Sequence, residues 1–148
     1  MPADGAAPTV VVSSVASDSH TWNLVFLQLL IEECGYHVVN LGPCVPTALL
    51  EAELRAWQPA LLVMSTVNGH GYRDGLSAVT RLRAHPELAT TPMVIGGKLS
   101  ISGTDSGERV GHLLAAGFDA VFDETAHSVA SFRRFLTATP RRAGRELR

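Results

Sequence analysis

Residues 9–35 read TVVVSSVASDSHTWNLVFLQLLIEECG and contain one complete strand-loop-helix unit. The β-branched run at residues 9–15 does not alternate with polar residues, which is typical of a strand covered on both faces. The leucine-rich segment at residues 23–34 places apolar residues at helical spacing, namely Leu24, Leu27, Leu30, Ile31 and Cys34. Gly35 then provides the glycine that commonly ends a helix. This stretch predicts a buried strand followed by a helix that packs on it.

The rest of the chain repeats this unit. Strand-like runs follow at residues 37–41, 60–65, 92–95 and 120–122. Helical patterns run from Pro46 to Pro59 and at about residues 73–84, 106–116 and 128–136, with Gly117 ending one of them. The positions expected to face the core are Leu50, Leu54, Trp57, Leu76, Val79, Leu82, Val110, Leu113, Leu114, Val129, Phe132 and Phe135. Five β-α units in strict alternation predict a doubly wound α/β domain with a parallel sheet in the flavodoxin-like order 2-1-3-4-5.

Composition sets limits on the class of protein. With 148 residues, 46% of them hydrophobic and 18% charged, the chain suits one domain at about residues 9–137. Residues 1–8 are expected to be flexible, and the arginine-rich residues 138–148 to form a disordered tail. A net charge of −2 does not favour a nucleic acid or an anionic membrane as partner. Without a long apolar run or a signal peptide, a cytoplasmic location is expected, with Cys34 and Cys44 as reduced, partly buried thiols.

In the predicted strand order, the loops after strands 1, 3 and 4 meet at the carboxyl edge of the sheet, where such folds bind ligands. In the first loop, the carboxylate of Asp18 can accept a hydrogen bond from one nitrogen of His20, which makes the other nitrogen a better metal ligand. The alternative is a solvated loop with a capping side chain. Ser65 and Thr66 offer hydroxyls, although at a strand end these are commonly satisfied locally by the backbone. Gly96 and Gly97 allow the backbone to approach a ligand closely, although such a pair also forms ordinary turns.

Together these three stretches resemble the cobalamin-binding domain of the B12-dependent mutases, and most closely the small subunit of glutamate mutase (methylaspartate mutase). The signature of that family is Asp-x-His-x-x-Gly, then Ser-x-Leu, then Gly-Gly, and residues 18–23, 65–67 and 96–97 stand in those places. Residues 38–42 and 68–71 also match hallmarks of the small subunit. The sequence departs from the signature at Asn23, where the family has glycine, and at Val67, where it has leucine.

The resemblance implies a cobalamin bound with its own base displaced and His20 as the axial ligand of cobalt, supported by Asp18. The displaced nucleotide tail would enter a slot between the sheet and the first helix, lined by small residues. The residues assigned to the cofactor in this way are Asp18, Ser19, His20, Thr21, Trp22, Asn23, Ser65, Thr66, Val67, Gly69, Gly96, Gly97 and Leu99. Asn23 requires either a loop conformation with positive φ, which asparagine tolerates, or a different approach of the corrin.

The resemblance also implies a role in a larger enzyme. The cofactor would be adenosylcobalamin, and a separate large TIM-barrel subunit would cover it and bind the amino acid or acyl substrate, so no catalytic residue is expected on this chain alone. Asn68, His70 and Tyr72 are candidates for contact with that partner. The other histidines, His37, His85, His112 and His127, show no partner pattern and are interpreted as structural or surface residues.

Other classes of protein remain possible. A corrinoid carrier for methyl transfer would use the same histidine and aspartate but usually has a helical domain before the cobalamin domain. A receiver-like signalling module needs an acidic residue at the end of strand 3, where Ser65 and Thr66 stand. A flavodoxin-like protein needs glycine in its first loop. A degenerate domain that only mediates interactions is compatible with Asn23.

Overall fold

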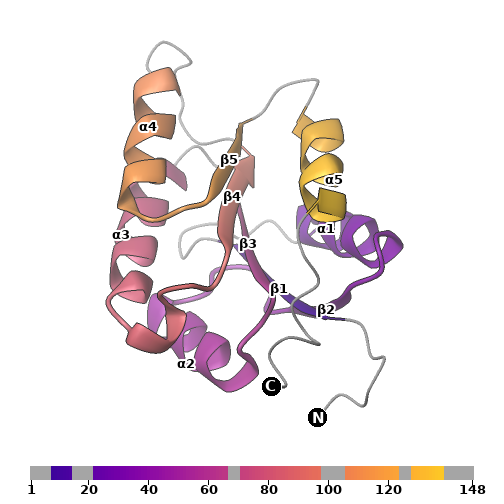
Figure 1. Ribbon diagram of the computed structural model, residues 1–148, viewed down its shortest axis with the longest axis horizontal. Helices are drawn as coiled ribbons and strands as arrows, with labels where there is room; N and C mark the ends of the chain where they lie inside the picture. The colour runs from indigo at the N-terminus through magenta and orange to yellow at the C-terminus, as the bar shows by residue number, and fades with distance from the viewer. Residues whose placement is uncertain (1–7, 15–21, 67–70, 98–105, 124–127, 139–148) are drawn as a thin grey trace.

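Strands and helices alternate along the chain in the computed structural model, which describes residues 8–14, 22–66, 71–97, 106–123 and 128–138 (Figure 1). The strands are β1 (Thr9–Ser14), β2 (His37–Asn40), β3 (Leu61–Thr66), β4 (Met93–Gly97) and β5 (Ala120–Asp123). The helices are α1 (Trp22–Glu33), α2 (Thr47–Trp57), α3 (Gly71–Arg83), α4 (Ser106–Ala116) and α5 (Ser128–Ala138), with a short 3-10 helix, η1 (Pro86–Leu88).

The strands form one parallel sheet in the order β2-β1-β3-β4-β5, as the sequence predicted. Helices cover both faces. Figure 1 shows α1 and α5 on one side of the sheet and α2, α3 and α4 on the other. Because all strands run in the same direction, their carboxyl ends form one edge, and the first residues of the connections to the following helices lie there.

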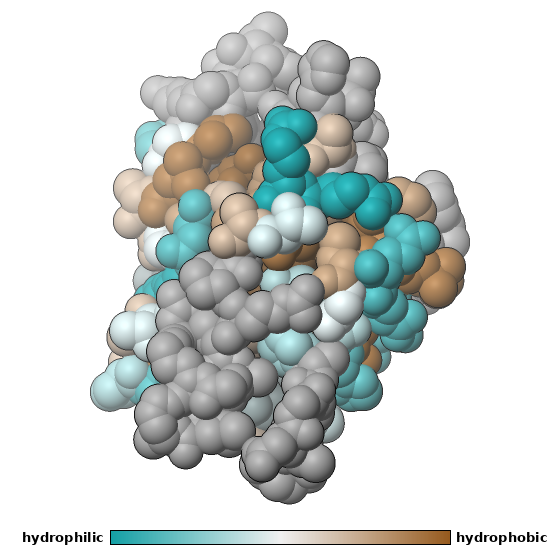
Figure 2. All heavy atoms as spheres, turned by 45° about the vertical axis from the view of Figure 1, so that its right-hand side comes forward, coloured by the Kyte–Doolittle hydropathy of each residue, from teal (hydrophilic) through white to brown (hydrophobic). Residues whose placement is uncertain are grey.

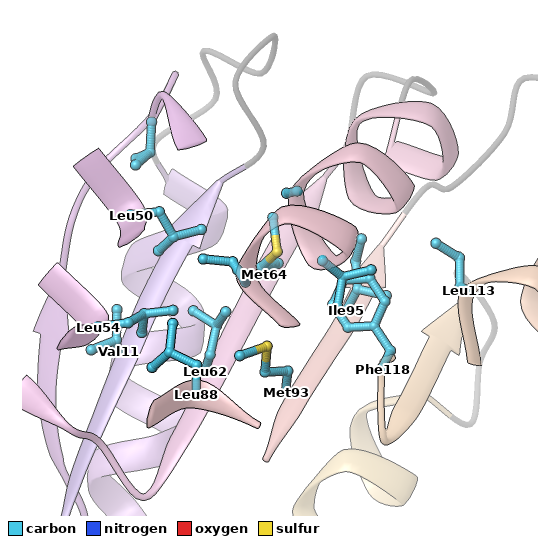
Figure 3. Packing of buried hydrophobic residues seen from close by; sticks show 14 residues of the cluster. Val11, Leu50, Leu54, Leu62, Met64, Leu88, Met93, Ile95, Leu113 and Phe118 are labelled. Atoms are coloured by element: carbon cyan, nitrogen blue, oxygen red, sulfur yellow. The ribbon is translucent and has the colours of Figure 1, made fainter. Parts of the chain in front are cut away.

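Each face of the sheet has its own hydrophobic core. Leu50, Leu54, Val79, Leu82 and Leu113 from α2, α3 and α4 pack on one face against Leu62, Met64, Met93 and Ile95 (Figure 3). On the other face, α1 and α5 contribute Leu24, Leu30, Ile31, Phe132 and Leu136, which pack against Val10, Val12, Val63 and Val94. The central strands β1, β3 and β4 are buried on both sides, and this explains why their sequences are continuous apolar runs.

Three glycines have a structural role in the helices and at their ends. Gly75 lies in the middle of α3, and a Cβ there would come within 2.7 Å of the Ile95 side chain, so the glycine lets α3 approach β4 closely. Gly117 follows α4 with φ of 139°, a conformation that favours glycine. Gly35 follows α1 with φ of 95°. The helix ends predicted at Gly35 and Gly117 are confirmed.

A half-buried arginine joins the connections at the amino-terminal edge of the sheet. Arg83, the last residue of α3, donates to the carbonyl oxygens of Leu88 at 2.8 Å, Thr91 at 2.8 Å and Gly117 at 2.7 Å. It also pairs with Asp119 at 3.1 Å, and that carboxylate accepts a hydrogen bond from the Met93 backbone at 2.8 Å. The guanidinium group of Arg83 therefore holds together the loops before β4 and β5, at the edge of the sheet opposite the predicted site.

Some local expectations were wrong. Trp57 is 44% exposed instead of facing the core, because it is the last residue of α2 and the chain turns at Gln58, whose φ is 48°. Leu114 is 43% exposed, since its neighbour Leu113 takes the core-facing position of α4. Cys44 is exposed, not partly buried. No helix in the described ranges is long and apolar enough to cross a membrane.

Candidate cofactor-binding site

A row of small residues crosses the sheet at its carboxyl edge. Ser14 of β1 pairs in register with Ser65 of β3, and Ser65 pairs with Gly96 of β4. The two serines are 2% and 4% exposed. Since side chains alternate along a strand, the row lies on the same face as Val12, Val63 and Val94, two residues earlier, which pack under α1 and α5. We call Ser14, Ser65 and Gly96 the small-residue row.

The row is bounded by larger groups on both sides. On the β5 side, Phe122 pairs in register with Gly96, and its ring packs edge-on against Phe132 at 5.3 Å and Phe135 at 5.8 Å between ring centroids. On the β2 side, the Ser14 hydroxyl donates to the carbonyl oxygen of Gly42 at 3.3 Å. No side chain in the row is larger than serine. This end of the α1 face is therefore lined by small side chains, in contrast to the valines two residues earlier on the same strands.

Gly96 also has a structural reason to be glycine. A Cβ at this position would lie 2.9 Å from the carbonyl oxygen of Phe122 and 3.3 Å from its Cβ. Gly96 and Gly97 are the last two residues of β4, paired with β3 and β5, and not a loop after the strand as the sequence suggested. Close pairing of β4 with β5 is therefore a role for Gly96 that the sequence reasoning missed.

The predicted cofactor residues fall into three groups. Ser65, Thr66, Gly96 and Gly97 are brought together at the carboxyl edge, with Thr66 directly opposite Gly97 in register. Trp22 and Asn23 form the beginning of α1. The remaining predicted cofactor residues lie outside the described residues, namely Asp18, Ser19, His20, Thr21, Val67, Gly69 and Leu99, and so do Asn68, His70 and His127. Tyr72 lies in the first turn of α3, which begins next to the end of β3 in sequence.

The structure settles the backbone of Asn23. It is the second residue of α1, and the non-glycine residues with positive φ in the described ranges are Cys44 and Gln58. Of the two alternatives given for Asn23, the loop conformation with positive φ is therefore wrong, and a different approach of the corrin stays a prediction. Ser14 was not among the predicted site residues, although the change from valines to two serines at the end of β1 is a signal that could have identified it.

Among the described residues, the histidines belong to other parts of the fold. His85 contacts Glu51 of α2 through Nε2 at 2.6 Å, and Arg81 contacts the other oxygen of the same carboxylate at 2.8 Å. The hydrogen bond from His85, followed by that from Arg81, lowers the pKa of Glu51 below its ordinary value. His37 lies beside the Trp57 ring. In the ranges that the structure covers, no three His, Cys, Asp or Glu residues are grouped as ligands of a metal ion.

A small pocket lies on the opposite face of the sheet from the small-residue row. It has a volume of about 100 Å³ and lies between α2, α3 and β3, lined by Val45, Thr47, Leu50, Met64, Asp74, Ser77 and Ala78. Met64 belongs to the core of the α2, α3 and α4 layer, so this pocket is separated from the row by the sheet itself. The pocket is too small for a cobalamin tail and is not the predicted site.

The described residues fit the cofactor implied by the sequence resemblance. The nucleotide tail of a base-off cobalamin is an extended polar group, and it needs small, hydrogen-bonding neighbours between the sheet and α1. Two buried serines and a glycine, in register on three adjacent strands, provide that lining. Cobalt in cobalamin is held by the corrin ring and takes a single protein ligand, so no cluster of metal-ligating side chains is required.

Comparisons with known proteins point to the same cofactor. The B12 binding domain family matches residues 8–132. The glutamate mutase sigma subunit of Halobacterium salinarum is 30% identical over 115 residues, which cover 78% of this chain and 76% of that protein. A novel cobalamin-binding protein from Desulfitobacterium hafniense DCB-2 superposes with a TM-score of 0.68 at 18% identity, over 86% of this chain and 56% of that one. The chemotaxis response regulator CheY4 of Vibrio cholerae shares the fold. It superposes with a TM-score of 0.60 at 10% identity, over 88% of this chain and 98% of that one.

Proposed function

Because the chain belongs to the B12 binding domain family, and to its group of glutamate mutase sigma subunits, we propose that it is the cobalamin-binding small subunit of such a mutase. The cofactor in this proposal is adenosylcobalamin, bound base-off with His20 as the axial ligand. The observation that carries the proposal is the small-residue row under α1. It lies at the carboxyl ends of β1, β3 and β4, where the three motifs of the B12 signature begin or follow.

The residues of this chain would hold and orient the cofactor. Asp18 accepts a hydrogen bond from one imidazole nitrogen of His20, which fixes the tautomer and leaves the second nitrogen as the donor to cobalt. Ser14 and Ser65 present hydroxyls to the nucleotide tail. Residues 15–21, which include His20, connect the end of β1 to the beginning of α1.

The reaction requires a partner. When bound, adenosylcobalamin supplies the radical chemistry of a carbon-skeleton rearrangement, such as that of glutamate to 3-methylaspartate. The chain forms one α/β domain with no second domain among its described residues that could enclose a substrate. We therefore propose that a separate large subunit covers the carboxyl edge of the sheet, binds the amino acid or acyl substrate and excludes water from the reaction.

The axial-ligand assignment is tested with the purified chain and hydroxocobalamin. We expect a base-off visible spectrum, and electron paramagnetic resonance of the Co(II) form should show hyperfine coupling that changes when histidine is labelled with ¹⁵N. His20→Gly should abolish this coupling. The control is His37→Ala, at the opposite end of the sheet in β2, which should keep it. An unchanged spectrum and affinity in His20→Gly would contradict the assignment.

A corrinoid carrier for methyl transfer is the second candidate, and it would give the same spectrum. The two functions are separated by activity. Mixed with the large mutase subunit of the source organism and adenosylcobalamin, the chain should support conversion of glutamate to 3-methylaspartate. Cobalamin binding without rearrangement of glutamate or a related substrate would favour the carrier. Absence of cobalamin binding would favour a degenerate interaction domain.

A further inference from the structure

Asn40 lies at the β2 side of the small-residue row. It is the last residue of β2, an edge strand, and it pairs in register with Val12 of β1. Val38, two residues earlier, is buried in the core under α1, so alternation along the strand places the Asn40 side chain on that same face. Beyond β2 the described residues add no further strand to the sheet. On this side, contacts between α1 and β2 therefore close the space between helix and sheet.

Both polar groups of the Asn40 side chain are hydrogen-bonded. Its Nδ2 donates to Oε1 of Gln28 in α1 at 3.2 Å, and its Oδ1 accepts from the backbone nitrogen of Gly42 at 2.9 Å. The carbonyl oxygen of Gly42 in turn accepts from Ser14 twice, from its backbone nitrogen at 3.4 Å and from its hydroxyl at 3.3 Å. One side chain thus links helix α1 to the carbonyl group that bounds the row.

Gly42 owes its position to these hydrogen bonds more than to packing. Its φ of 89° favours glycine, but a Cβ at this position would meet nothing within 4 Å. Neighbouring side chains therefore do not confine the turn on that side. The backbone ladder to β1 includes Leu41, whose nitrogen donates to the Val12 carbonyl oxygen at 2.8 Å. After that bond, the contacts of Gly42 with Asn40 and Ser14 determine where its carbonyl group lies.

The contact between Asn40 and Gln28 lies just below the row. Asn40 is level with Val12, which precedes Ser14 by two residues, or about 7 Å along the strand. At this level the small side chains of the row give way to the valines of the core. A group that entered between α1 and the sheet from the carboxyl edge would therefore meet the Asn40–Gln28 contact at the lower corner of the row on the β2 side.

A different contact holds α1 on its other side. Glu33 pairs with Arg133 of α5 at 3.4 Å, and both side chains are largely exposed. Figure 2 shows hydrophobic and strongly hydrophilic side chains next to each other at the surface of the side that α1 and α5 form. The Glu33–Arg133 pair joins α1 to a helix and not to a strand of the row. It therefore offers a matched comparison for the contact made by Asn40.

We propose that Asn40 is a positioning residue for the nucleotide tail of the cofactor. It acts through Gly42, which holds the Ser14 hydroxyl at the β2 side of the row, and through Gln28, which sets the spacing between α1 and the edge strand. The inference rests on the proposed function. Cobinamide has the corrin ring and cobalt but no nucleotide tail, so Asn40 should matter for the binding of cobalamin and not for that of cobinamide.

The test compares the affinities of the full chain for hydroxocobalamin and for cobinamide, in titrations followed by the visible spectrum. Asn40→Leu keeps the size of the side chain and removes both hydrogen bonds, so it should weaken cobalamin binding about tenfold and leave cobinamide binding unchanged. Asn40→Asp keeps the acceptor for the Gly42 nitrogen and should retain more of the cobalamin affinity. Gln28→Leu introduces a good helix former and removes only the link to α1, so its effect on cobalamin should be smaller than that of Asn40→Leu. The control Arg133→Gln should bind both ligands as wild type does.

The outcomes separate this inference from the function on which it rests. If Asn40→Leu weakens the binding of both ligands equally, or of neither, Asn40 does not position the tail, and the inference is overturned while the cobalamin assignment stands. If Asn40→Leu does not fold, an unchanged ratio of the two affinities in both Asn40→Asp and Gln28→Leu overturns it in the same way. Wild-type protein that binds neither ligand would overturn the proposed function itself.

Discussion

Gly96 has two possible reasons to lack a side chain, and the geometry separates them. A cofactor slot favours a small residue, but a Cβ at this position would already meet the Phe122 carbonyl oxygen of β5 at 2.9 Å in the protein alone. A backbone atom of a paired strand cannot move aside as a flexible side chain can. The pairing of β4 with β5 therefore requires glycine at position 96 even when no ligand is bound.

We expect Gly96→Ala to destabilise the apoprotein by about 1–3 kcal/mol, because the added methyl forces β4 and β5 apart. Urea unfolding of the cofactor-free protein measures this. The matched control is Gly111→Ala in α4, where a Cβ would meet nothing within 4 Å and a helical alanine should stabilise by roughly 0.5–1 kcal/mol. If Gly96→Ala is as stable as wild type without cofactor, the small residue serves only the ligand.

At the level of elements, the sequence predicted every strand and every long helix, because buried parallel strands and amphipathic helices have strong local patterns. The sequence-based prediction was wrong where contacts between residues far apart in the chain determine the local structure. Gly96 and Gly97 look like a turn but extend β4, because β3 and β5 on either side provide hydrogen-bonding partners. Trp57 fits the apolar stripe of α2, yet it lies at the helix end, where a left-handed Gln58 turns the chain away from the core.

The contact between α2 and the end of α3 depends on a carboxylate. Glu51 accepts hydrogen bonds from His85 and Arg81, and these lower its pKa in the folded state. A carboxyl group with a lowered folded-state pKa stabilises the fold above its unfolded-state pKa, about 4.3, and this stabilisation disappears as the pH falls through the folded-state value. Both contacts are near the surface, so the effect is small and sensitive to salt.

We expect Glu51→Gln to lower the free energy of unfolding at pH 7 and to have a diminishing effect as the pH is lowered from about 5 to 3. Urea unfolding of both proteins across this range gives the difference directly. Glu53→Gln is the control, because Glu53 lies on the same helix and accepts a hydrogen bond from Trp57 instead of a cation. This variant should lose stability at low pH as the wild-type protein does. A difference between wild type and Glu51→Gln that stays constant with pH would contradict this explanation.

For the whole molecule, the sequence indicates where the proposed site lies more directly than which side chains line it. Three motifs after strands 1, 3 and 4 indicate the carboxyl edge, because parallel strands bring their ends together. Which side chains face α1 depends on register. Ser14 enters the site through its pairing with Ser65, and Phe122 bounds it through its pairing with Gly96. Neither pairing can be inferred from local sequence.

A ligand held between the sheet and α1 should stabilise the domain as a unit. At a cobalamin concentration one hundred times its dissociation constant, binding adds about 2.7 kcal/mol, and for a domain of this size that raises Tm by roughly 5–10 °C. Cobinamide, which lacks the nucleotide tail, should raise Tm less. In Ser65→Val, two methyl groups replace the hydroxyl, which should reduce the effect of cobalamin to that of cobinamide and leave the effect of cobinamide unchanged. Equal shifts with both ligands in the wild-type protein would mean that the small-residue row does not receive the tail, and its small side chains would then serve strand pairing alone.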